Sequence, residues 1–455
     1  MAFDVRDPRA LRPAPQKRLR VAVIGSGVSG ISAAWLLSAD HEVVVYEKDR
    51  RLGGHANTVA VETADGTMGV DAGFIVFNKS NYPNLTALFD HLGVGVEETN
   101  MSFAASIDRG RIEYSGQGLA AVFANPASVC SPSHWAMIRD ILRFNREAKA
   151  ALGEGLDEGE TLGAFVHRQA YSKAFVDRFL APMAAAIWST PSLDILDYPA
   201  ASLFRFYANH GLFQVANNPR WNTVTGGSRE YVERLSAPFA ANARLGCAVA
   251  QVARDSGGVV VRDEHGHVDR FDHAVIAAHA DCALAMIDRP TSREAALLGA
   301  FRYQPNRAFV HTDRSAMPVR RRVWASWNFM GGDGAPAVTY WMNRLQNLAC
   351  RQDIFVTLNP SSPIREDAII ASFDYDHPMF NVDAIKAQRE LWSLQGEGGL
   401  WFCGAHFGAG FHEDGLQAGL AVAEDLGGVR RPWTVENESG RIWRHAPAPI
   451  AMAAE

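Results

Sequence analysis

The sequence predicts an α/β protein in which a Rossmann-like, nucleotide-binding domain is combined with a second, α+β domain. Three observations lead to this prediction. A short apolar strand at residues 21–24 runs into a glycine-rich turn and then into a helix. A second unit of strand, glycine loop and helix lies near the other end, at residues 400–426. With 455 residues, the chain is also too long for one ordinary core, so two domains are expected.

The first glycine turn has the spacing of a dinucleotide-binding fingerprint. Gly25 suits the tight turn, Gly27 lets the backbone approach a pyrophosphate, and Gly30 lets the helix pack closely on the strand. The helix starts at this turn, so the N–H groups of Val28 and Ser29 and the positive end of the helix dipole favour the diphosphate.

The next strand, residues 42–47, ends in an acidic residue about 20 positions after the first glycine. This residue is Glu47, and Lys48 follows it. A carboxylate at this point accepts hydrogen bonds from the ribose hydroxyls of a dinucleotide, and its charge disfavours a 2′-phosphate. We therefore include both residues in the predicted cofactor site.

The segment that follows this strand resembles part of a known family. Arg51-Leu-Gly53-Gly54-His55-Ala-Asn-Thr58 is similar to the RxGGxxxT segment of the flavin-containing amine oxidase and phytoene desaturase superfamily. The glycine pair allows a second close backbone approach, and Arg51 can meet phosphate charge. The resemblance implies that the segment binds FAD, although the family commonly has arginine where His55 stands.

The C-terminal glycine loop is similar to the flavin-binding segment of the same superfamily. A strand enters Gly404, and a helix is predicted over residues 417–426. The resemblance implies that Gly404 meets the diphosphate-ribityl part of the cofactor. It also implies that the backbone of Asp414, Gly415 and Leu416 faces the flavin ring.

Three further strands are expected at residues 246–252, 258–262 and 274–278. They match the β-meander of the superfamily, in which the backbone of Val249 clasps the adenine. The resemblance thus implies an FAD-binding domain of the glutathione reductase type with amine oxidase topology, and FAD that is bound non-covalently. A covalent flavin on Cys403 is the alternative, but a thiol at a strand end is more simply a packing residue.

If these segments contact one FAD, both domains are discontinuous in sequence. The expected FAD-binding domain comprises residues 18–92, 222–290 and 396–430, the substrate-binding domain comprises 93–221 and 291–395, and 1–17 and 431–455 are loose tails.

Helices are expected first in the substrate-binding domain. Ser133 is expected to cap a helix whose packed face carries Trp135, Ile138, Leu142 and Ala148.

Beyond that helix, a second one is expected from residue 164 to residue 180, ending before Pro182. Aromatic stretches at 323–328 and 338–342 are expected to be strands of the sheet that roofs the flavin. The apolar segment 193–213, which Arg205 and His210 interrupt, is either a core helix or a lipid-facing entry lip.

The residues expected near the flavin point away from an amine substrate. Phe411 stands where the superfamily usually has a second framing tyrosine, and no counterpart is found for the lysine that the amine oxidases place near the flavin. Together with Tyr340 and Trp327, Phe411 is expected to line an apolar substrate pocket, although aromatic residues also fill ordinary cores.

Alkene formation needs a positioned base to remove a proton. Glu413, His412 and Tyr82 are the catalytic candidates, and the alternative is that the His-Glu-Asp run only fixes its loop.

The strings Trp324-Ala-Ser-Trp-Asn328, Tyr340-Trp-Met-Asn343 and Gly410-Phe-His-Glu-Asp-Gly415 resemble a bacterial, amine oxidase-like branch of the superfamily. Its members are associated with methyltransferases of the cyclopropane-fatty-acid-synthase type. This implies an FAD-dependent oxidoreductase that oxidises or desaturates a methylated or unsaturated fatty-acyl chain by hydride transfer to flavin N5. An amine or polyamine oxidase that releases hydrogen peroxide and a redox-neutral double-bond isomerase are the alternatives.

Composition limits the partners and the compartment. The net charge of −6 and the pI near 6.2 give no basic excess for nucleic acid, and no metal site is expected because the five cysteines are scattered. No apolar run is long enough to span a membrane, and no signal segment is found, so a cytoplasmic protein is expected. The basic N-terminal arm is a solvated tail or a weak peripheral contact with anionic lipid. The electron acceptor stays open between oxygen, a quinone and a protein.

Overall fold

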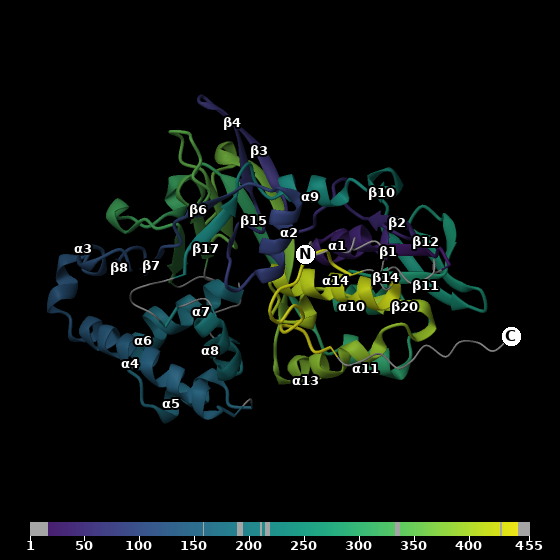
Figure 1. The fold of residues 1–455 in the computed structure, drawn as a ribbon. Helices are drawn as coiled ribbons and strands as arrows, with labels where there is room; N and C mark the ends of the chain where they lie inside the picture. Colours follow the sequence, from purple (N-terminus) through teal and green to yellow (C-terminus); the bar gives the residue numbers. More distant parts are fainter. Residues whose placement is uncertain are drawn as a thin grey trace, which may run out of the picture.

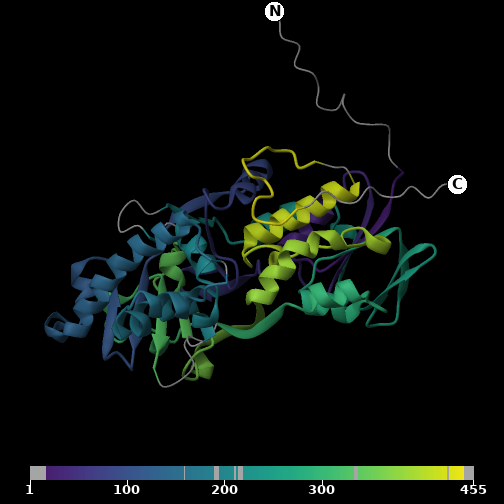
Figure 2. The same ribbon diagram turned by 90° about the horizontal axis from the view of Figure 1, so that it is seen from below.

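The structure is a computed structural model that describes residues 17–157, 159–188, 194–209, 212–213, 219–332, 337–427 and 430–444. Most of the basic N-terminal arm, and His210, lie outside the described residues. Figures 1 and 2 show two lobes, with the nucleotide-binding elements on one side and the helices of residues 119–209 on the other. No helix in the described ranges is long and apolar enough to cross a membrane.

A five-stranded parallel sheet forms the base of the first lobe. Its strands come from distant parts of the chain, in the spatial order β10 (Ala243–Leu245), β2 (Glu42–Glu47), β1 (Arg20–Ile24), β14 (His273–Ile276) and β20 (Leu400–Phe402). All four strand pairs are parallel, and Val21, Ala22 and Val23 of the central strand β1 are fully buried. The N-terminal, central and C-terminal segments predicted to hold the nucleotide therefore share one sheet.

Helices α1 (Val28–Leu37) and α14 (His412–Gly427) pack along each other, and α1 contacts strands β1, β2 and β14 of this sheet (Figure 1). Gly419 permits the close approach, since a Cβ there would lie 2.1 Å from the carbonyl oxygen of Ser29. The two helices begin at the carboxyl ends of β1 and β20, so their N-termini face the same space. Anionic ligands bind at such positions.

The β-meander differs from the prediction in its third strand. It consists of β11 (Val249–Asp255), β12 (Gly258–Asp263) and β13 (Val268–Phe271). Residues 274–276, predicted as the third meander strand, belong instead to β14 of the parallel sheet. Their uninterrupted burial fits a central parallel strand and could have indicated this.

A seven-stranded mixed sheet forms the roof over the cofactor side of the first lobe. In spatial order its strands are β19 (Ile369–Met379), β15 (Arg302–His311), β18 (Phe355–Leu358), β17 (Ala337–Trp341), β16 (Trp327–Gly331), β7 (Phe103–Ile107) and β8 (Ile112–Ser115). The prediction of a strand at 323–328 is correct only at its end, because residues 321–323 form a 3₁₀ turn. The strands β7 and β8 were not predicted.

The predicted helix near residue 133 exists, but its cap and its packed face were wrong. Helix α4 spans Pro132–Glu154, and the side chain of Ser131, rather than that of Ser133, accepts a hydrogen bond from the N–H of His134. Met137, Phe144 and Ala148 are buried on this helix, whereas two residues predicted for the packed face, Trp135 and Leu142, are exposed.

The helix predicted for residues 164–180 is interrupted, and helical structure continues through Pro182. Helix α5 spans Leu162–Arg168, Ala170 then adopts a positive φ of 51°, and α6 spans Lys173–Phe175. A π-helical turn, η3 (Val176–Leu180), then leads into α7 (Ala181–Trp188). Pro182 has no N–H for the carbonyl of Arg178, and the hydroxyl of Tyr114 donates to that carbonyl at 2.6 Å instead.

The described part of segment 193–213 is mainly the core helix α8 (Ala200–Asn209), in which Leu203, Phe204 and Tyr207 are buried. The described part of the predicted C-terminal tail is packed rather than loose. Arg431 is almost fully buried and donates to Glu424 and to Asn84.

The remaining elements are β3 (Thr58–Thr63), β4 (Gly66–Asp71), β5 (Val76–Asn78), α2 (Pro83–Leu92), β6 (Val96–Thr99), α3 (Leu119–Val122), α5 (Leu162–Arg168), α6 (Lys173–Phe175), β9 (Trp221–Val224), α9 (Arg229–Ser236), α10 (Ala280–Met286), α11 (Ser292–Leu298), α12 (Met342–Leu345) and α13 (Val382–Leu391).

Candidate active site

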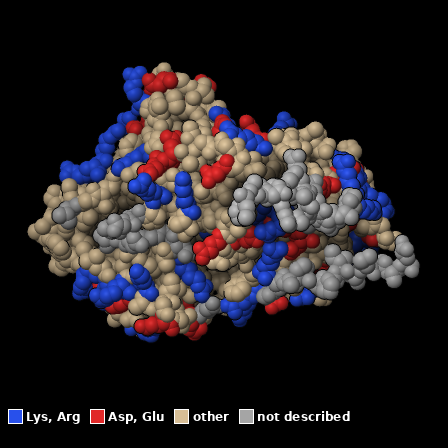
Figure 3. Space-filling model, in the orientation of Figure 1, with Lys and Arg blue, Asp and Glu red and all other residues tan. Residues whose placement is uncertain are grey.

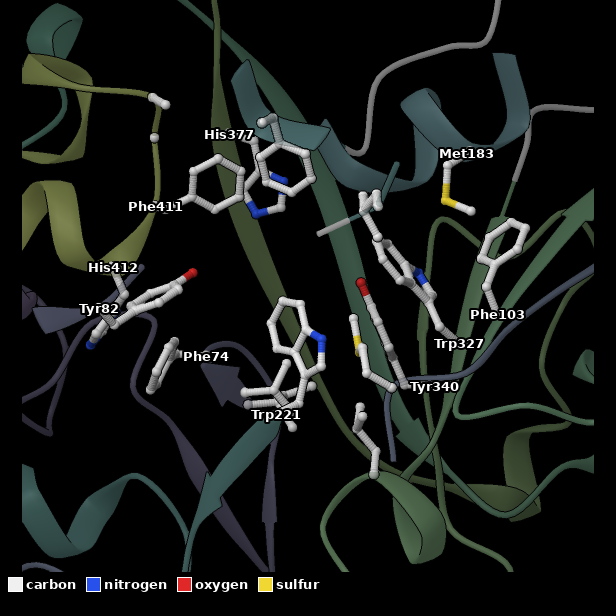
Figure 4. Close-up of a pocket in the computed structure, with 18 of the residues that line it drawn as sticks. Phe74, Tyr82, Phe103, Met183, Trp221, Trp327, Tyr340, His377, Phe411 and His412 are labelled. Carbon is white, nitrogen blue, oxygen red and sulfur yellow. The ribbon is translucent and has the colours of Figure 1, made fainter. Parts of the chain in front are cut away.

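A cavity of about 1030 Å³ lies between the two lobes. One end is formed by Gly27, Val28 and Ser29 at the start of α1, and by the loop that follows Gly404. The other end is lined by aromatic, methionine and aliphatic side chains of the roof sheet and of α4 (Figure 4). The glycine loop expected to bind a dinucleotide and the apolar side chains therefore line the same cavity.

The glycine positions of the first loop fit a bound dinucleotide. A Cβ on Gly25 would lie 2.6 Å from the carbonyl oxygen of Ala277, and one on Gly30 would lie 1.9 Å from that of Gly25, so both glycines are required by packing. In contrast, a Cβ on Gly27 would meet nothing within 4 Å. Gly27 therefore faces open space, where a pyrophosphate can approach the backbone.

Glu47 lies at the carboxyl end of β2 beside this loop. Its carboxylate accepts hydrogen bonds from the N–H of Ser26 at 2.9 Å and from the hydroxyl of Ser26 at 2.5 Å. It also accepts the N–H of Asp49 at 2.8 Å. The buried carboxylate thus holds the glycine loop and stands where a ribose would be expected, while Lys48 is exposed.

The roles predicted for Arg51 and Thr58 need correction. The guanidinium of Arg51 donates to the carbonyls of Leu52, Gly54 and Ala56, so it organises the Gly53-Gly54 turn rather than presenting its charge to a phosphate. The hydroxyl of Thr58 donates to Asp71 at 2.6 Å and accepts the N–H of Arg229.

The turn that Arg51 holds nevertheless lies at the cofactor loop. A Cβ on Gly54 would lie 2.9 Å from the Cα of Gly27. On the adenine side, Val249 begins β11 opposite Asp263, and its side chain is partly exposed. Gly54 therefore lies next to the cofactor loop, whereas the contact of Val249 with the adenine stays a prediction.

The second glycine loop meets the first at the start of α14. A Cβ on Gly415 would lie 2.9 Å from Val28 and 3.6 Å from the N–H nitrogen of Ala405. Leu416 is fully buried, and the carboxylate of Asp414 accepts the N–H of Phe411 and the guanidinium of Arg441. Asp414, Gly415 and Leu416 are not among the residues that line the cavity, so their backbone contact with the flavin stays a prediction.

Two histidines of the cavity leave polar atoms without partners. His55 and His406 both line the cavity, and the Nε2 atom of each is buried and has no hydrogen-bond partner among the described residues. Buried polar atoms are normally satisfied, so these atoms indicate a polar ligand in this part of the cavity. The unpartnered Nε2 atoms of His55 and His406 and the open space beside Gly27 together fit the FAD that the sequence implies.

Comparison with known proteins decides the family. The sequence profile described as flavin containing amine oxidoreductase matches residues 28–343, which is more than half of the chain. The chain belongs to this family. It is a flavin-dependent oxidoreductase of the family, and its cofactor is FAD.

The curated relatives are distant and match in part. A protein of Mycobacterium tuberculosis that carries the name flavin-containing monoamine oxidase AofH is 24% identical over 279 residues, which cover 56% of this chain and 56% of that protein. The 15-cis-phytoene desaturase of Narcissus pseudonarcissus is 31% identical over 169 residues, which cover 36% of this chain and 27% of the desaturase. The chain therefore spans about half, or less, of the length of these relatives.

Solved structures share the fold over nearly their whole length. Putrescine oxidase bound to putrescine has a TM-score of 0.62 at 15% identity, covering 90% of this chain and 99% of the oxidase. The CLA-producing fatty acid isomerase from P. acnes has a TM-score of 0.62 at 13% identity, covering 91% of this chain and 99% of the isomerase. These likenesses show the amine oxidoreductase fold.

Glu413, one of the three catalytic candidates, is not among the residues that line the cavity, and its contacts fit the alternative that it fixes its loop. One carboxylate oxygen accepts the N–H of Asn84 at 3.0 Å and the other accepts that of Leu85 at 3.0 Å. These are free N–H groups in the first turn of α2, and an acidic group there stabilises the helix. The side chains of Asn84 and Gln417 complete the shell, so Glu413 joins α14 to α2.

His412 and Tyr82, the other two catalytic candidates, do line the cavity (Figure 4). The ring of His412 stacks on Phe74 at 3.9 Å, and its Nε2 lies 2.6 Å from the hydroxyl of Tyr231. Burial lowers the pKa of His412 to about 3 and raises that of Tyr231 well above its usual range. The tyrosine therefore donates to Nε2, and the proton of the neutral imidazole resides on Nδ1. Burial also raises the pKa of Tyr82, which remains a phenol.

Sequence reasoning missed His377 on β19, another polar residue that lines the cavity. Its ring lies 5.8 Å from that of His55, and Figure 4 shows it at the top of the cavity beside Phe411. Burial, reinforced by the nearby His279, lowers the pKa of His377 to about 4, so the imidazole is neutral. No other described side chain forms a hydrogen bond to it. The only signal that could have indicated His377 was the alternation of exposed and inward-facing residues along β19.

One group of metal-ligand type lies at the margin of the cavity. His279, Asp281 and Cys282 each place one ligand atom within 4.8 Å of the others. Asp281 and Cys282 are exposed, and the carboxylate of Asp281 already accepts the N–H of Cys282.

The predicted substrate-pocket residues are brought together. Trp327 and Tyr340 lie side by side on β16 and β17 with ring centroids 6.1 Å apart, and Phe411 stacks on Phe206 of α8 at 5.0 Å. All of them line the cavity. Cys403 does not, since it is fully buried at the end of β20 and burial raises the pKa of its thiol to about 12.

Proposed function

We propose that the protein is an FAD-dependent dehydrogenase that oxidises a C–H bond of a long apolar substrate, most simply a fatty-acyl chain. The observation that carries this proposal is the apolar chamber that continues from the cofactor loops. Its wall includes side chains from five distant segments of the chain: Met101, Phe103, Met137, Ile138, Met183, Trp221, Trp327 and Tyr340. Because these side chains are mostly apolar, the chamber favours the methylene groups of a substrate over polar groups.

The charge of the lining argues against an ammonium group as the main determinant. The two carboxylates at the cavity, Glu98 and Asp376, are exposed at its margins, and Glu98 pairs with Arg220 at 2.8 Å. A buried cation without a buried counter-charge is costly. Every lysine of the chain is exposed, so no amine of the protein stands in the chamber either.

When bound, FAD would supply the hydride acceptor for such an oxidation. The chain itself would hold the acyl chain between aromatic walls, exclude water and receive the proton that leaves the neighbouring carbon. His377 is the best placed acceptor, because its imidazole is neutral and lines the cavity. His412 is less suited, because its Nε2 already accepts from Tyr231.

Mass spectrometry of the reaction distinguishes the candidate activities. FAD-loaded protein is incubated with acyl esters of defined length and an artificial electron acceptor. A product two hydrogens lighter supports the proposal. An unchanged mass with a moved double bond identifies an isomerase, for which the solved fatty acid isomerase is a precedent for this fold. Peroxide formed with putrescine, and no change in any acyl ester, contradicts the proposal.

A further inference from the structure

Helix α4 exposes a stripe that combines large apolar and basic side chains. Trp135, Arg139, Leu142, Arg146 and Lys149 are spaced alternately by four and three residues, which places them on one face of a helix. Trp135 and Leu142 are 50% and 55% exposed. The side chains of Arg139 and Arg146 are 67% and 76% exposed. We call these five residues the α4 stripe.

The apolar surface continues beyond the helix. The indole N–H of Trp135 donates to the carbonyl of Val129 at 2.8 Å, and Val129 itself is 51% exposed. The ring of Phe123 lies 5.1 Å from that of Trp135. Soluble surfaces expose single large apolar residues, but neighbouring ones with a tryptophan indicate a binding surface.

The charge of the stripe is positive, although the whole chain carries −6. Arg139 pairs with Asp140, and Arg146 with Glu147, but Asp140 is fully buried and Glu147 is only 26% exposed. Lys149 has no ion pair among the described residues. The cations therefore point outward while their acidic partners point inward. Figure 3 shows basic side chains where Figure 1 places α4, beside a largely uncharged end of the molecule.

The stripe also meets the cavity. Leu142 is more than half exposed and at the same time lines the cavity, together with Ile138, Ile141 and Asn145 on the adjacent flank of α4. Leu142 therefore belongs both to the stripe and to the wall of the cavity. A long apolar molecule that enters here passes directly from whatever covers the stripe to the aromatic walls.

We propose that the α4 stripe docks the protein on an anionic lipid bilayer, and that acyl chains enter the cavity past Leu142. Tryptophan and leucine side chains insert at the boundary between headgroups and hydrocarbon, and long basic side chains reach the lipid phosphates. An acyl chain then moves from bilayer to chamber without crossing water. This inference rests on the proposed acyl substrate for its purpose, but the docking itself is measurable without turnover.

The test is sedimentation of the FAD-loaded, full-length protein with two kinds of vesicle, phosphatidylcholine alone and phosphatidylcholine mixed with phosphatidylglycerol. We expect binding to the mixed vesicles that weakens with added salt. Arg146→Glu should lower the partition coefficient by roughly fivefold or more, because each basic residue near the surface contributes about 1 kcal/mol. Trp135→Ser should lower it as well.

Matched controls lie in the other lobe and in the C-terminal segment. Trp443 is 47% exposed, close to the value for Trp135, and Trp443→Ser should leave vesicle binding unchanged. Arg289 has a side chain that is 94% exposed, and Arg289→Glu should likewise have no effect. If the two stripe variants bind as the two control variants do, or if the parent protein binds neither kind of vesicle, the proposal is overturned.

Turnover separates this inference from the proposed function. Trp135→Ser should oxidise acyl esters dispersed in detergent at the parent rate and lose rate only with esters in vesicles. A loss in both presentations would mean that the stripe serves turnover rather than docking, and would overturn the inference. If the protein binds vesicles but oxidises acyl esters neither in detergent nor in vesicles, the proposed dehydrogenase activity is refuted and the docking proposal stands.

Discussion

At the level of single residues, the cofactor loops are defined by the space that their glycines leave open. Gly25 and Gly30 are required by contacts inside the protein, whereas Gly27 borders empty space at the start of α1. Glu47 and Arg51 fix the surrounding turns through Ser26 and Gly54. Contacts inside the protein therefore fix the shape of the loop around Gly27.

Gly27→Ala should leave the fold intact and weaken FAD binding. The added methyl meets nothing within 4 Å in the protein, but it would occupy open space in which we expect the pyrophosphate to bind. We expect the dissociation constant for FAD to rise about tenfold or more, which corresponds to about 1.4 kcal/mol. Titration of the flavin-free protein by fluorescence quenching measures this change.

Alanine variants of two further glycines serve as controls for that experiment. Gly30→Ala should unfold at lower denaturant, because its Cβ would clash with the carbonyl of Gly25. Gly153→Ala, which also has free space but lies at the end of α4, should bind FAD as the parent does. Unchanged FAD affinity in Gly27→Ala would place the pyrophosphate elsewhere.

Glu413→Gln and His377→Gln should have opposite effects. The first replaces a carboxylate that satisfies the N–H groups of Asn84 and Leu85, so we expect a loss of about 2 kcal/mol in unfolding free energy with turnover retained. The second removes the neutral base of the cavity and should lower turnover at least about tenfold with little loss of stability. Urea unfolding and single-turnover kinetics of both variants decide the matter, and the reverse pattern would restore Glu413 as the base.

Residues whose function depends on local spacing could be predicted, and residues whose partners are distant in sequence could not. The glycine fingerprint and Glu47 lie within one βαβ unit, where the order of elements carries the signal. Glu413 binds Asn84, more than 300 positions away, and no local pattern reveals that partner. His377 was missed for the same reason, because it approaches the cavity from the roof sheet.

At the level of elements, α4 shows how a correct helix can be assigned the wrong face. The spacing of Trp135, Ile138, Leu142 and Ala148 predicted one apolar face, whereas Met137 and Phe144 lie on the neighbouring face. The structure buries Met137 and Phe144 and exposes Trp135, because α6 and α8 pack on the former side. Sequence periodicity alone cannot separate a buried face from an apolar face that serves a ligand or a membrane.

The π-helical turn before Pro182 was also beyond sequence rules, because its stabilising partner comes from β8. The hydroxyl of Tyr114 satisfies the Arg178 carbonyl that Pro182 leaves free. Tyr114→Phe should therefore lower the unfolding free energy by about 1 kcal/mol. In a Pro182→Ala background, which restores an N–H, the same change should cost less. A double-mutant cycle by urea unfolding tests this, and equal costs in both backgrounds would show that the two groups are not coupled.

At the level of the whole molecule, buried polar contacts join the lobes around the cavity. The amide of Gln346 in the second lobe donates to Asp71 at 2.8 Å, and Asn57 donates to the hydroxyl of Tyr375 at 3.0 Å. The parallel sheet was foreseeable from its strand–helix order. The seven-stranded roof was not, since the parallel pairing of β16 with β7 joins segments more than 200 residues apart.

Acid should destabilise the molecule through its buried histidines. Burial lowers the pKa of His311 to about 4 and that of His406 to about 3, below the usual value of 6.5. The unfolded chain therefore binds more protons than the native one between about pH 4 and pH 6.5, and the unfolding free energy falls as the pH drops through this range. Each histidine contributes roughly 2 kcal/mol to the loss at pH 5. Asp71, whose pKa burial raises to about 6, offsets part of it.

Urea unfolding at pH 7 and pH 5 measures this effect. His311→Gln removes one of the titrating groups, so the fall in stability between the two pH values should be smaller in this variant. A midpoint that is equal or higher at pH 5 in the parent protein would show that the histidines are not held neutral by the fold.

If one cavity brings FAD and a long apolar substrate together, the substrate should reduce the bound flavin. Anaerobic mixing of the FAD-loaded protein with acyl esters of increasing length tests it most directly, with the flavin absorbance in the blue as the signal. We predict bleaching that becomes faster as the chain lengthens, and no bleaching with putrescine. Bleaching by putrescine, together with no response to any acyl ester, would contradict the account.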